Sequence, residues 1–263
     1  MRVVSSLLSF AVTLLLTQQT TPSLPTPAPA SDPQAISLLQ QCAKSLGPTS
    51  GVQDIAMSGT MTRTMNENTQ VPFSYQTKGY SQLRQEITFA DHSEILLVSG
   101  GQGSFNSAGV ARQPLPVWVT YYQRPDFFPA LICNAEITRS DTVIFYLGVE
   151  TVAAGSVHHI VISAAPLGKN PDVDADQTAI SAFHVYLDTQ TLRVVATKHF
   201  VFSPDTSANR SDWQTFYSDY RSVGSILVPY HMECFIAGQK YFMIDLTTTT
   251  VNNGLSDSEF SQP

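Results

Sequence analysis

Hydrophobic residues recur with two different spacings along this chain. Over residues 33–46 they follow the 3.6-residue repeat of a helix, so that Leu39 and Leu46 fall on one apolar face. Asp32-Pro33 suits an N-cap followed by the first helical position, and Gly47 suits the end of the helix. The pattern predicts an amphipathic helix over residues 33–46.

From residue 53 onward, hydrophobic and polar residues alternate, as in strands with one buried face. The alternation predicts an antiparallel meander of about ten or eleven strands and no second domain boundary. Residues 164–179 are expected to form a polar loop. The expected strands lie near residues 55–62, 73–75, 83–89, 95–98, 143–149, 157–163, 183–187, 193–202, 213–221, 226–236 and 242–246.

Residues 114–133 interrupt the alternation with four prolines and a cluster of aromatic residues. Proline excludes a long helix or a central strand there, so we expect short helices around residues 117–123 and 126–132. Two interpretations stay open. The aromatic residues form an ordinary core layer, or the segment is a lid over an apolar cavity on the concave face of a curved sheet.

The first 30 residues have the composition of an export signal and a linker. The apolar stretch from Val3 to Leu16 has the length of a signal-peptide core and is too short to span a bilayer. Residues 17–33 are rich in Thr, Pro, Ala and Gln. We therefore expect a signal peptide and linker over residues 1–30, one β domain over residues 31–263, and no transmembrane span in the mature chain.

Charge and cysteine content narrow the possible partners. The chain has 263 residues and a formal net charge of −7, and Arg2 is the only charged residue of the first 30. No basic stripe is present, so nucleic acid is not an expected partner. The three cysteines, Cys42, Cys133 and Cys234, suit either one disulfide with one free thiol or three buried thiols.

No common catalytic motif is present, and we expect no catalytic residue, no metal and no cofactor. Residues 172–176 begin like a calcium loop, but Gln177 stands where glycine is required and Phe183 where the bidentate glutamate is required. A solvated acidic loop is the simpler interpretation. The histidines on predicted strands are expected to be surface or hydrogen-bonded residues: His158, His159, His184, His199 and His231.

Three stretches occur in an order found in a known family. Residues 148–160 are similar to its Gly-x-Glu-x-Val-x-Gly turn, and residues 185–193 to its Leu-Asp-x-x-Thr hairpin. Gly224 and Pro229 lead into an ending, residues 251–263, that is similar to its Asn-x-Gly-Leu-x-Asp-x-x-Phe-x-x-Pro segment. The chain thus resembles a distant member of the periplasmic outer-membrane lipoprotein carrier (LolA/LolB-like) superfamily.

The resemblance implies a mainly β fold: an incomplete antiparallel β-barrel with an N-terminal helix and short helices covering its concave face, in a periplasmic or secreted protein. It also implies a basic residue on an early strand, for which Arg63 and Arg84 are candidates. The length and the proline-rich insert depart from the family. Another apolar ligand, or a role as an envelope sensor, therefore stays open beside lipoprotein sorting.

The function expected from these features is a non-catalytic exported carrier that binds the acyl chains of a lipoprotein, or another lipid, in a hydrophobic cavity. Its partners would be a lipid or acylated lipoprotein and an envelope transporter or receptor. The alternative is a secreted protein-interaction or sensor module with a packed core. The expected cavity lining is Phe73, Tyr75, Trp118, Tyr121, Tyr122, Phe127, Phe128, Leu131, Phe183, Val185, Val228, Tyr230 and Met232.

Overall fold

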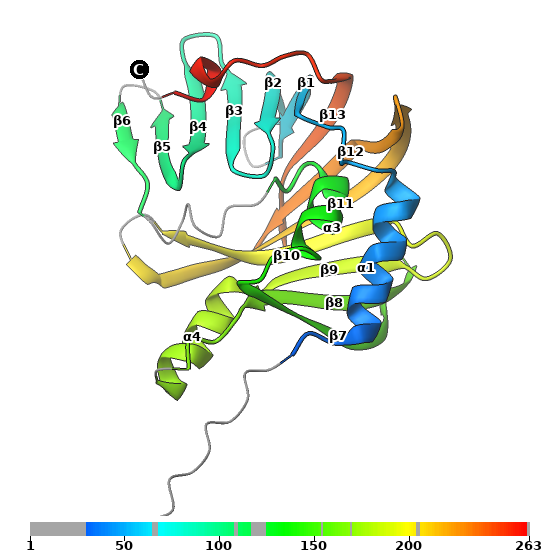
Figure 1. Ribbon diagram of the computed structural model, residues 1–263. Helices are drawn as coiled ribbons and strands as arrows, with labels where there is room; N and C mark the ends of the chain where they lie inside the picture. Colours follow the sequence, from blue (N-terminus) through cyan, green and yellow to red (C-terminus); the bar gives the residue numbers. More distant parts are fainter. Residues whose placement is uncertain are drawn as a thin grey trace, which may run out of the picture.

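The computed structural model describes residues 30–64, 68–107, 110–116, 125–153, 155–168, 170–203 and 206–261. The described strands form one 13-stranded antiparallel sheet that curls around two helices (Figure 1). The strands are β1 (Asp54–Arg63), β2 (Thr69–Lys78), β3 (Gln82–Thr88), β4 (Ser93–Ser99), β5 (Gln102–Ser107), β6 (Val110–Pro114), β7 (Thr142–Val152), β8 (Gly155–Ala164), β9 (Phe183–Asp188), β10 (Val194–Ser203), β11 (Thr206–Val223), β12 (Ile226–Ile236) and β13 (Gln239–Val251).

The sheet consists of two meanders joined by one strand pair. Strands β1 to β6 and β7 to β13 each run in sequence order, and β1 pairs with β13 between them. The two outer strands are β6 and β7, so the barrel stays open between elements that follow each other in the chain. Between these two strands in sequence lies α3 (Pro129–Glu136), which packs against α1 and β12. The expectation of an incomplete antiparallel barrel is confirmed.

The seam between the meanders depends on a close backbone approach at Gly59. The register shifts between Ser58 and Gly59, opposite Thr247. A Cβ atom on Gly59 would lie 2.1 Å from the carbonyl oxygen of Asp245 and 2.7 Å from the Cα atom of Leu246. Glycine is therefore the residue that allows β1 and β13 to pair at this point.

The N-terminal helix α1 spans Pro33–Leu46, as its hydrophobic spacing predicts. The Asp32 carboxylate accepts a hydrogen bond of 2.8 Å from the backbone N–H of Gln34 and caps the helix. Gly47 ends it with a positive φ of 93°, and a Cβ atom there would meet the carbonyl oxygen of Ser225 at 2.2 Å. The C-terminal end of the helix therefore packs closely against the turn between β11 and β12.

Two helix predictions need correction. The helix expected over residues 126–132 begins at Pro129, because proline at the first helical position suits Pro129 as well as it suits Pro125. The polar loop expected over residues 164–179 contains a helix, α4 (Pro171–Ser181), capped by the Asn170 side chain. The three aspartates of the expected acidic loop, Asp172, Asp174 and Asp176, therefore lie in this helix. The helix expected over residues 117–123 lies outside the described residues.

The strand count exceeds the expected ten or eleven because β5 and β6 were not predicted. Both are short and lie at the outer edge of the sheet, next to the glycine-rich turn at Gly100 and Gly101. A short edge strand has only weak alternation, since its side chains are partly exposed on both faces. The remaining eleven strands match the expected runs.

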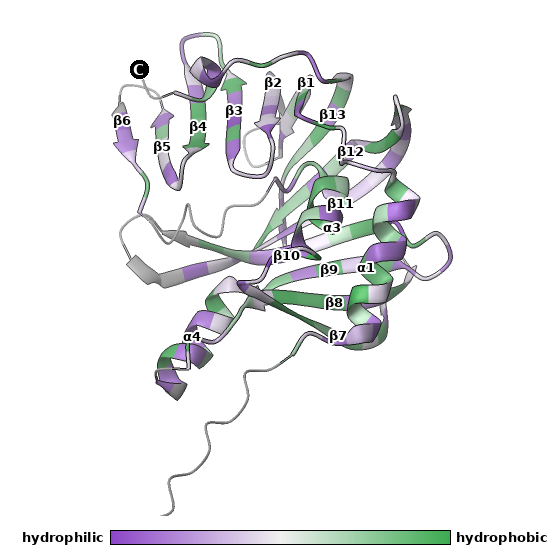
Figure 2. Ribbon diagram, in the orientation of Figure 1, coloured by the Kyte–Doolittle hydropathy of each residue, from purple (hydrophilic) through white to green (hydrophobic). Residues whose placement is uncertain are grey.

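The main core lies on the concave face, between the sheet and the helices α1 and α3. Leu39 and Cys42 of α1 and Ile132 and Cys133 of α3 are fully or almost fully buried there. Figure 2 shows strongly hydrophobic residues along β4 and β8. Among the described residues, no helix has the length and hydropathy needed to span a bilayer.

The chain ends on the opposite face of the first meander. A short 3-10 helix, η1 (Asp257–Phe260), packs against β3 and β4 (Figure 1). Phe260 is fully buried, as is Leu97, which faces away from the main core. The ending that carries the family resemblance therefore covers the outside of the sheet.

Candidate functional site

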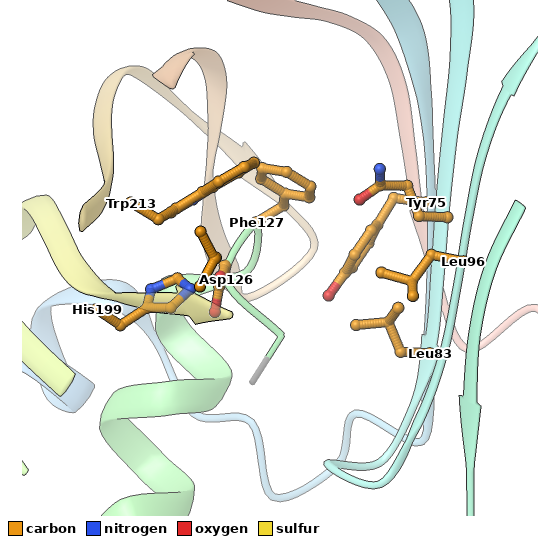
Figure 3. A pocket seen from close by; sticks show the side chains of 9 residues that line it. Tyr75, Leu83, Leu96, Asp126, Phe127, His199 and Trp213 are labelled. Carbon is orange, nitrogen blue, oxygen red and sulfur yellow. Dashed lines mark ion pairs between the residues drawn. The ribbon is translucent and has the colours of Figure 1, made fainter. Parts of the chain in front are cut away.

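A cavity of about 160 Å³ lies on the concave side, between the first meander and the strands β10 and β11. Figure 3 shows Tyr75, Leu83 and Leu96 on one side and Trp213, Phe127, Asp126 and His199 on the other. The alternation of strand side chains points the lining residues of β2, β3, β4, β10 and β11 inward, and Asp126 and Phe127 come from the segment before α3. The lining consists of Tyr75, Leu83, Gln85, Leu96, Asp126, Phe127, His199, Val201 and Trp213.

One wall comes from β2, β3 and β4 and is largely apolar. The register pairs Gln85 with Leu96, so both side chains lie on the same face of the sheet as Leu83. The Tyr75 ring meets the Phe127 ring edge-on, with 5.3 Å between the centroids. Phe73, on the same face of β2 as Tyr75, meets the same ring edge-on at 5.7 Å. Phe127 thus closes the cavity against the first meander.

The opposite wall comes from β10 and β11 and carries a histidine and a tryptophan. His199 stacks on the Phe183 ring, with 5.4 Å between the centroids. The Trp213 indole N–H donates a hydrogen bond of 3.0 Å to the Thr215 hydroxyl, and its ring meets Phe242 edge-on at 5.5 Å. These contacts hold both rings in place at the border of the cavity.

Asp126 and Phe127 precede α3 and reach the cavity because the backbone there is anchored from below. The Tyr217 hydroxyl donates a hydrogen bond of 2.7 Å to the carbonyl oxygen of Asp126 and receives one of 2.7 Å from the Thr197 hydroxyl. The Asp126 carboxylate lies 3.4 Å from Nε2 of His199 and is almost buried. The cavity therefore has one polar corner.

Tyr75 contributes a hydrogen-bond donor to this corner. Its hydroxyl is buried and has no hydrogen-bond partner among the described residues. Burial, and next the negative charge of Asp126, raise the pKa of Tyr75 well above its ordinary value. The same two causes raise the pKa of Tyr217. Both phenols thus stay protonated, and the Tyr75 hydroxyl can donate to an acceptor in the cavity.

The structure brings only part of the predicted lining to this cavity. Tyr75 and Phe127 line it, and the Phe73 and Phe183 rings contact lining residues. Leu131 and Tyr230 are partly buried at the edge of the core. Trp118, Tyr121 and Tyr122 lie outside the described residues. The members that are fully buried in the core, away from the cavity, are Phe128, Val185, Val228 and Met232.

Sequence reasoning missed the polar corner and most of the second wall. The alternation of hydrophobic and polar residues marks Leu83, Leu96 and Val201 as inward-facing, but it does not distinguish them from ordinary core residues. His199 falls on the inward phase of β10 and does not lie at the surface. Asp126 carried no signal, because only the fold places its segment over β10.

The two basic candidates of the early strands lie apart from the cavity lining. Arg63 lies on the same face of β1 as Met61, forms an ion pair with Glu94, and places its guanidinium 4.6 Å from the centre of the Phe89 ring. Arg84 pairs with Glu86 at 2.9 Å. Both arginines are therefore neutralised by neighbours on the first meander.

Two other sites in the fold offer fewer groups that could bind a ligand. A second hollow of about 410 Å³ lies between the loop after α1 and the turn between β11 and β12, and none of the described residues that line it is aromatic. On the outer face, Nε2 of His159 lies 2.8 Å from Nδ1 of His184. Within the described ranges, no group of three or more His, Cys, Asp or Glu side chains is placed to hold a metal ion.

Solved structures share this fold at low sequence identity. A domain from Vibrio parahaemolyticus described as an outer membrane lipoprotein-sorting protein is 8% identical, with a TM-score of 0.56 over 87% of this chain and 96% of that one. A LolA superfamily protein from Nitrosomonas europaea is 12% identical, with a TM-score of 0.51 over 87% and 97%.

A protein of the DUF1329 family from Desulfovibrio piger is 13% identical, with a TM-score of 0.51 over 87% and 96% of the two chains. No family model matches the sequence. No curated protein matches it either. The chain therefore has the fold of LolA superfamily proteins, and at these identities the comparisons establish the fold alone.

Proposed function

We propose that this chain is an exported, non-catalytic carrier that binds an acylated or otherwise apolar ligand between the two meanders of its sheet. The observation that carries the proposal is the cavity on the concave face, walled by aromatic and aliphatic side chains from both meanders. The fold, which this chain shares with a lipoprotein-sorting domain and a LolA superfamily protein, also supports a carrier function. The carrier would work in the periplasm or outside the cell, passing its ligand to an envelope transporter or receptor.

The apolar part of the ligand would lie against Leu83, Leu96, Phe127 and Trp213. These side chains offer no charge and present aliphatic and ring surfaces from opposite walls. Burial of apolar ligand surface there is worth about 25 cal/mol per Å². An acyl chain gains from such a surface over its whole length, whereas a polar metabolite does not.

The polar corner would receive the ligand's carbonyl group. Because the Tyr75 phenol stays protonated, it can donate a hydrogen bond to an ester or amide carbonyl. Asp126 and His199 border the same corner and suit hydroxyl or amide N–H groups of the ligand. An acylated lipoprotein carries both ester and amide carbonyls beside its chains.

The small volume of the cavity favours the alternative function, an interaction module with a packed core. About 160 Å³ is below the roughly 300–1,000 Å³ of typical ligand pockets. Uptake of a complete acyl chain therefore requires the first meander and the Phe127 segment to move apart. If they stay together, the second candidate holds: an exported protein-interaction module with a nearly packed core.

Binding is proposed over catalysis because the described residues that line the polar corner include no nucleophile of the common kinds. Asp126 and His199 have the pairing of an acid–base dyad, but none of the described lining residues beside them is a Ser, Cys or Lys. Cys234 lies on β12, outside the cavity lining. Burial raises the pKa of this cysteine well above the ordinary value, so it stays a protonated thiol.

Native mass spectrometry of the protein purified from the envelope tests the proposal directly. We expect a mass excess that is released on denaturation and extracts into organic solvent as a lipid or acylated peptide. An apo mass, together with no uptake of a fluorescent fatty acid by the purified protein, would sink the carrier function and leave the interaction module.

Trp213 gives a second test that places the ligand. The chain has two tryptophans, so Trp118→Phe leaves Trp213 as the only indole. We expect an acyl chain brominated near its terminus to quench the Trp213 emission, because bromine quenches only at close contact. The unbrominated chain is the control. Binding without quenching would place the ligand away from this cavity.

A further inference from the structure

Two cysteines from distant parts of the sequence meet inside the core. Cys42 lies on the buried face of α1, Cys133 lies on α3, and both side chains are fully buried. Their Sγ atoms are 2.7 Å apart. This distance is longer than an S–S bond of about 2.05 Å but shorter than an ordinary contact between two non-bonded sulfur atoms, and both side chains are free thiols in this structure.

The two helices are held in place by contacts that do not involve sulfur. The backbone N–H of Asp32, at the start of α1, donates a hydrogen bond of 2.8 Å to the carbonyl oxygen of Ile144 in β7. At the end of α3, the Tyr80 hydroxyl donates a hydrogen bond to the buried Glu136 carboxylate. The positions of the two thiols therefore do not depend on a bond between them.

The third cysteine has a different environment. Cys234 lies on β12, and its sulfur contacts the Thr215 hydroxyl at 3.7 Å. It is fully buried, so no partner outside the chain can reach it in the folded state. Only one of the three possible pairings is thus supported by a sulfur–sulfur contact.

We propose that Cys42 and Cys133 form a disulfide that joins α1 to α3 and leaves Cys234 as a free thiol. The proposal rests on the export in the proposed function, because disulfides form and persist in oxidising compartments. The two thiols would lose two protons and two electrons by exchange with a disulfide-bearing oxidant, whose S–S bond is reduced to two thiols. Since both sulfurs are buried in the final fold, exchange takes place before the core closes.

The bridge would fix one wall of the cavity. Asp126 and Phe127 immediately precede α3, so a covalent bond from α3 to α1 ties this wall to the N-terminal helix. Movements that open the cavity would then carry α1 and α3 as one body, or leave both in place while the first meander moves.

The test starts from the full-length chain, expressed with its own N-terminal segment and purified from the oxidising compartment. The denatured protein is alkylated without reductant and weighed. We expect one alkyl group per chain before reduction and three after it, and a peptide map that links Cys42 to Cys133. Three alkyl groups on a chain that has lost its leader, or a bridge to Cys234, would overturn the proposal.

Matched variants keep the result clear. Cys234→Ala should retain the bridge and show no free thiol, whereas Cys42→Ala and Cys133→Ala should each show two. Amide hydrogens of α3 should exchange faster in Cys42→Ala than in Cys234→Ala, because only the first variant frees α3 from α1. Equal exchange in both would contradict the role in fixing the wall. If the two bridge variants fail to fold, the wild type and Cys234→Ala still decide the pairing.

Failure of export is recognised separately from failure of the bridge. A chain that keeps its leader and stays in the cytosol would overturn export. The bridge is then tested by refolding the reduced, denatured chain with oxidised and reduced glutathione. Formation of the Cys42–Cys133 pair alone supports the bridge, and three free thiols or mixed pairings overturn it.

Discussion

Gly59 and Asp54 show how single residues hold the two meanders together. Both lie on β1, the strand that pairs with β2 on one side and β13 on the other. Gly59 allows the close approach to β13, and Asp54 binds the segment that follows β13. Neither residue lies near the cavity, so their replacement should affect stability more than ligand binding.

Gly59→Ala should lower the free energy of unfolding by about 3 kcal/mol, because the added methyl group collides with the β13 backbone and forces the seam apart. Urea unfolding followed by circular dichroism measures the change. Gly51→Ala is the control, since a Cβ atom there has no neighbour within 4 Å and the backbone φ is not positive. Equal stability of the two variants would contradict the assigned role.

The Asp54 carboxylate binds the chain's ending. It accepts hydrogen bonds from three backbone N–H groups, those of Asn253 at 2.8 Å, Gly254 at 3.0 Å and Leu255 at 3.2 Å. It is almost fully buried at the start of β1. The Asn-Asn-Gly-Leu stretch that suggests the family resemblance therefore binds the Asp54 carboxylate through its backbone N–H groups and holds the C-terminal segment against β1.

Asp54→Ala should cost about 3 kcal/mol of unfolding free energy, because three backbone donors lose the same buried, charged acceptor together. Thermal and urea unfolding measure it. Asp257→Ala is the matched control: it removes another carboxylate of the same region, but one that is exposed and paired with Lys78, so the unfolding free energy should change little. A similar loss in both variants would argue against the buried anchor.

His184 should make stability depend on pH. Burial, and then the nearby charges of His159 and Lys198, lower its pKa to about 4 in the folded chain, against about 6.5 in an unfolded one. Between these values the unfolded chain binds more protons. Stability should therefore be highest above pH 6.5 and fall as the pH drops toward 4.

Unfolding in urea at pH 7.5 and at pH 5 measures this effect, and His184→Gln should reduce the difference between the two. His231→Gln, which removes a histidine paired with Asp245 at 2.7 Å on another strand, should not reduce it. A difference unchanged by His184→Gln would assign the pH dependence to other groups.

At the scale of elements, helix starts were predictable where the cap was taken into account. Asp32-Pro33 and Asn170-Pro171 carry the same signal, a capping side chain followed by proline, and both begin helices. The second was missed because its apolar positions do not form one stripe and its aspartates suggested a loop. Asp172 and Asp174 instead lie in the first turn, where negative charge is favoured by the helix dipole.

The C-terminal element should stabilise the first meander. A chain that ends at Asn252 lacks the donors to Asp54 and the buried Phe260 of η1. We expect a lower melting temperature, and faster amide exchange in β3 and β4 than in β8 and β9, because η1 packs only on the first two of these strands. A chain lacking only residues 262–263 is the control. Uniform acceleration across the sheet would show that η1 has no local effect.

At the scale of the whole molecule, the cavity exists because two meanders curve toward each other across the β1–β13 seam. Its walls come from β2 to β4 on one side and β10 and β11 on the other, and the segment before α3 lies between them. A ligand there touches both meanders. Binding should therefore stabilise the molecule as a unit.

An acyl ligand at 100 times its dissociation constant should raise the unfolding free energy by about 2.7 kcal/mol, with a matching rise in melting temperature. Phe127→Asp should abolish the rise, because it places a carboxylate against the apolar wall. Phe235→Asp is the control: Phe235 packs edge-on against Phe216 outside the cavity lining. Circular dichroism checks that both variants fold. A rise that persists in Phe127→Asp would remove this residue from the site.

Local patterns were enough to predict the helix α1 with both of its ends, eleven of the strands, and the mainly β class of the fold. They act over a few residues, since the spacing of apolar side chains sets which face of a helix or strand is buried. Only the tertiary structure decided which inward faces meet. Ile55 pairs with Val251, and Asp126 reaches His199, through contacts between distant parts of the chain. The periodicity says that such residues point inward, but the register of β1 on β13 and the path of the chain from β6 to β7 determine what they face.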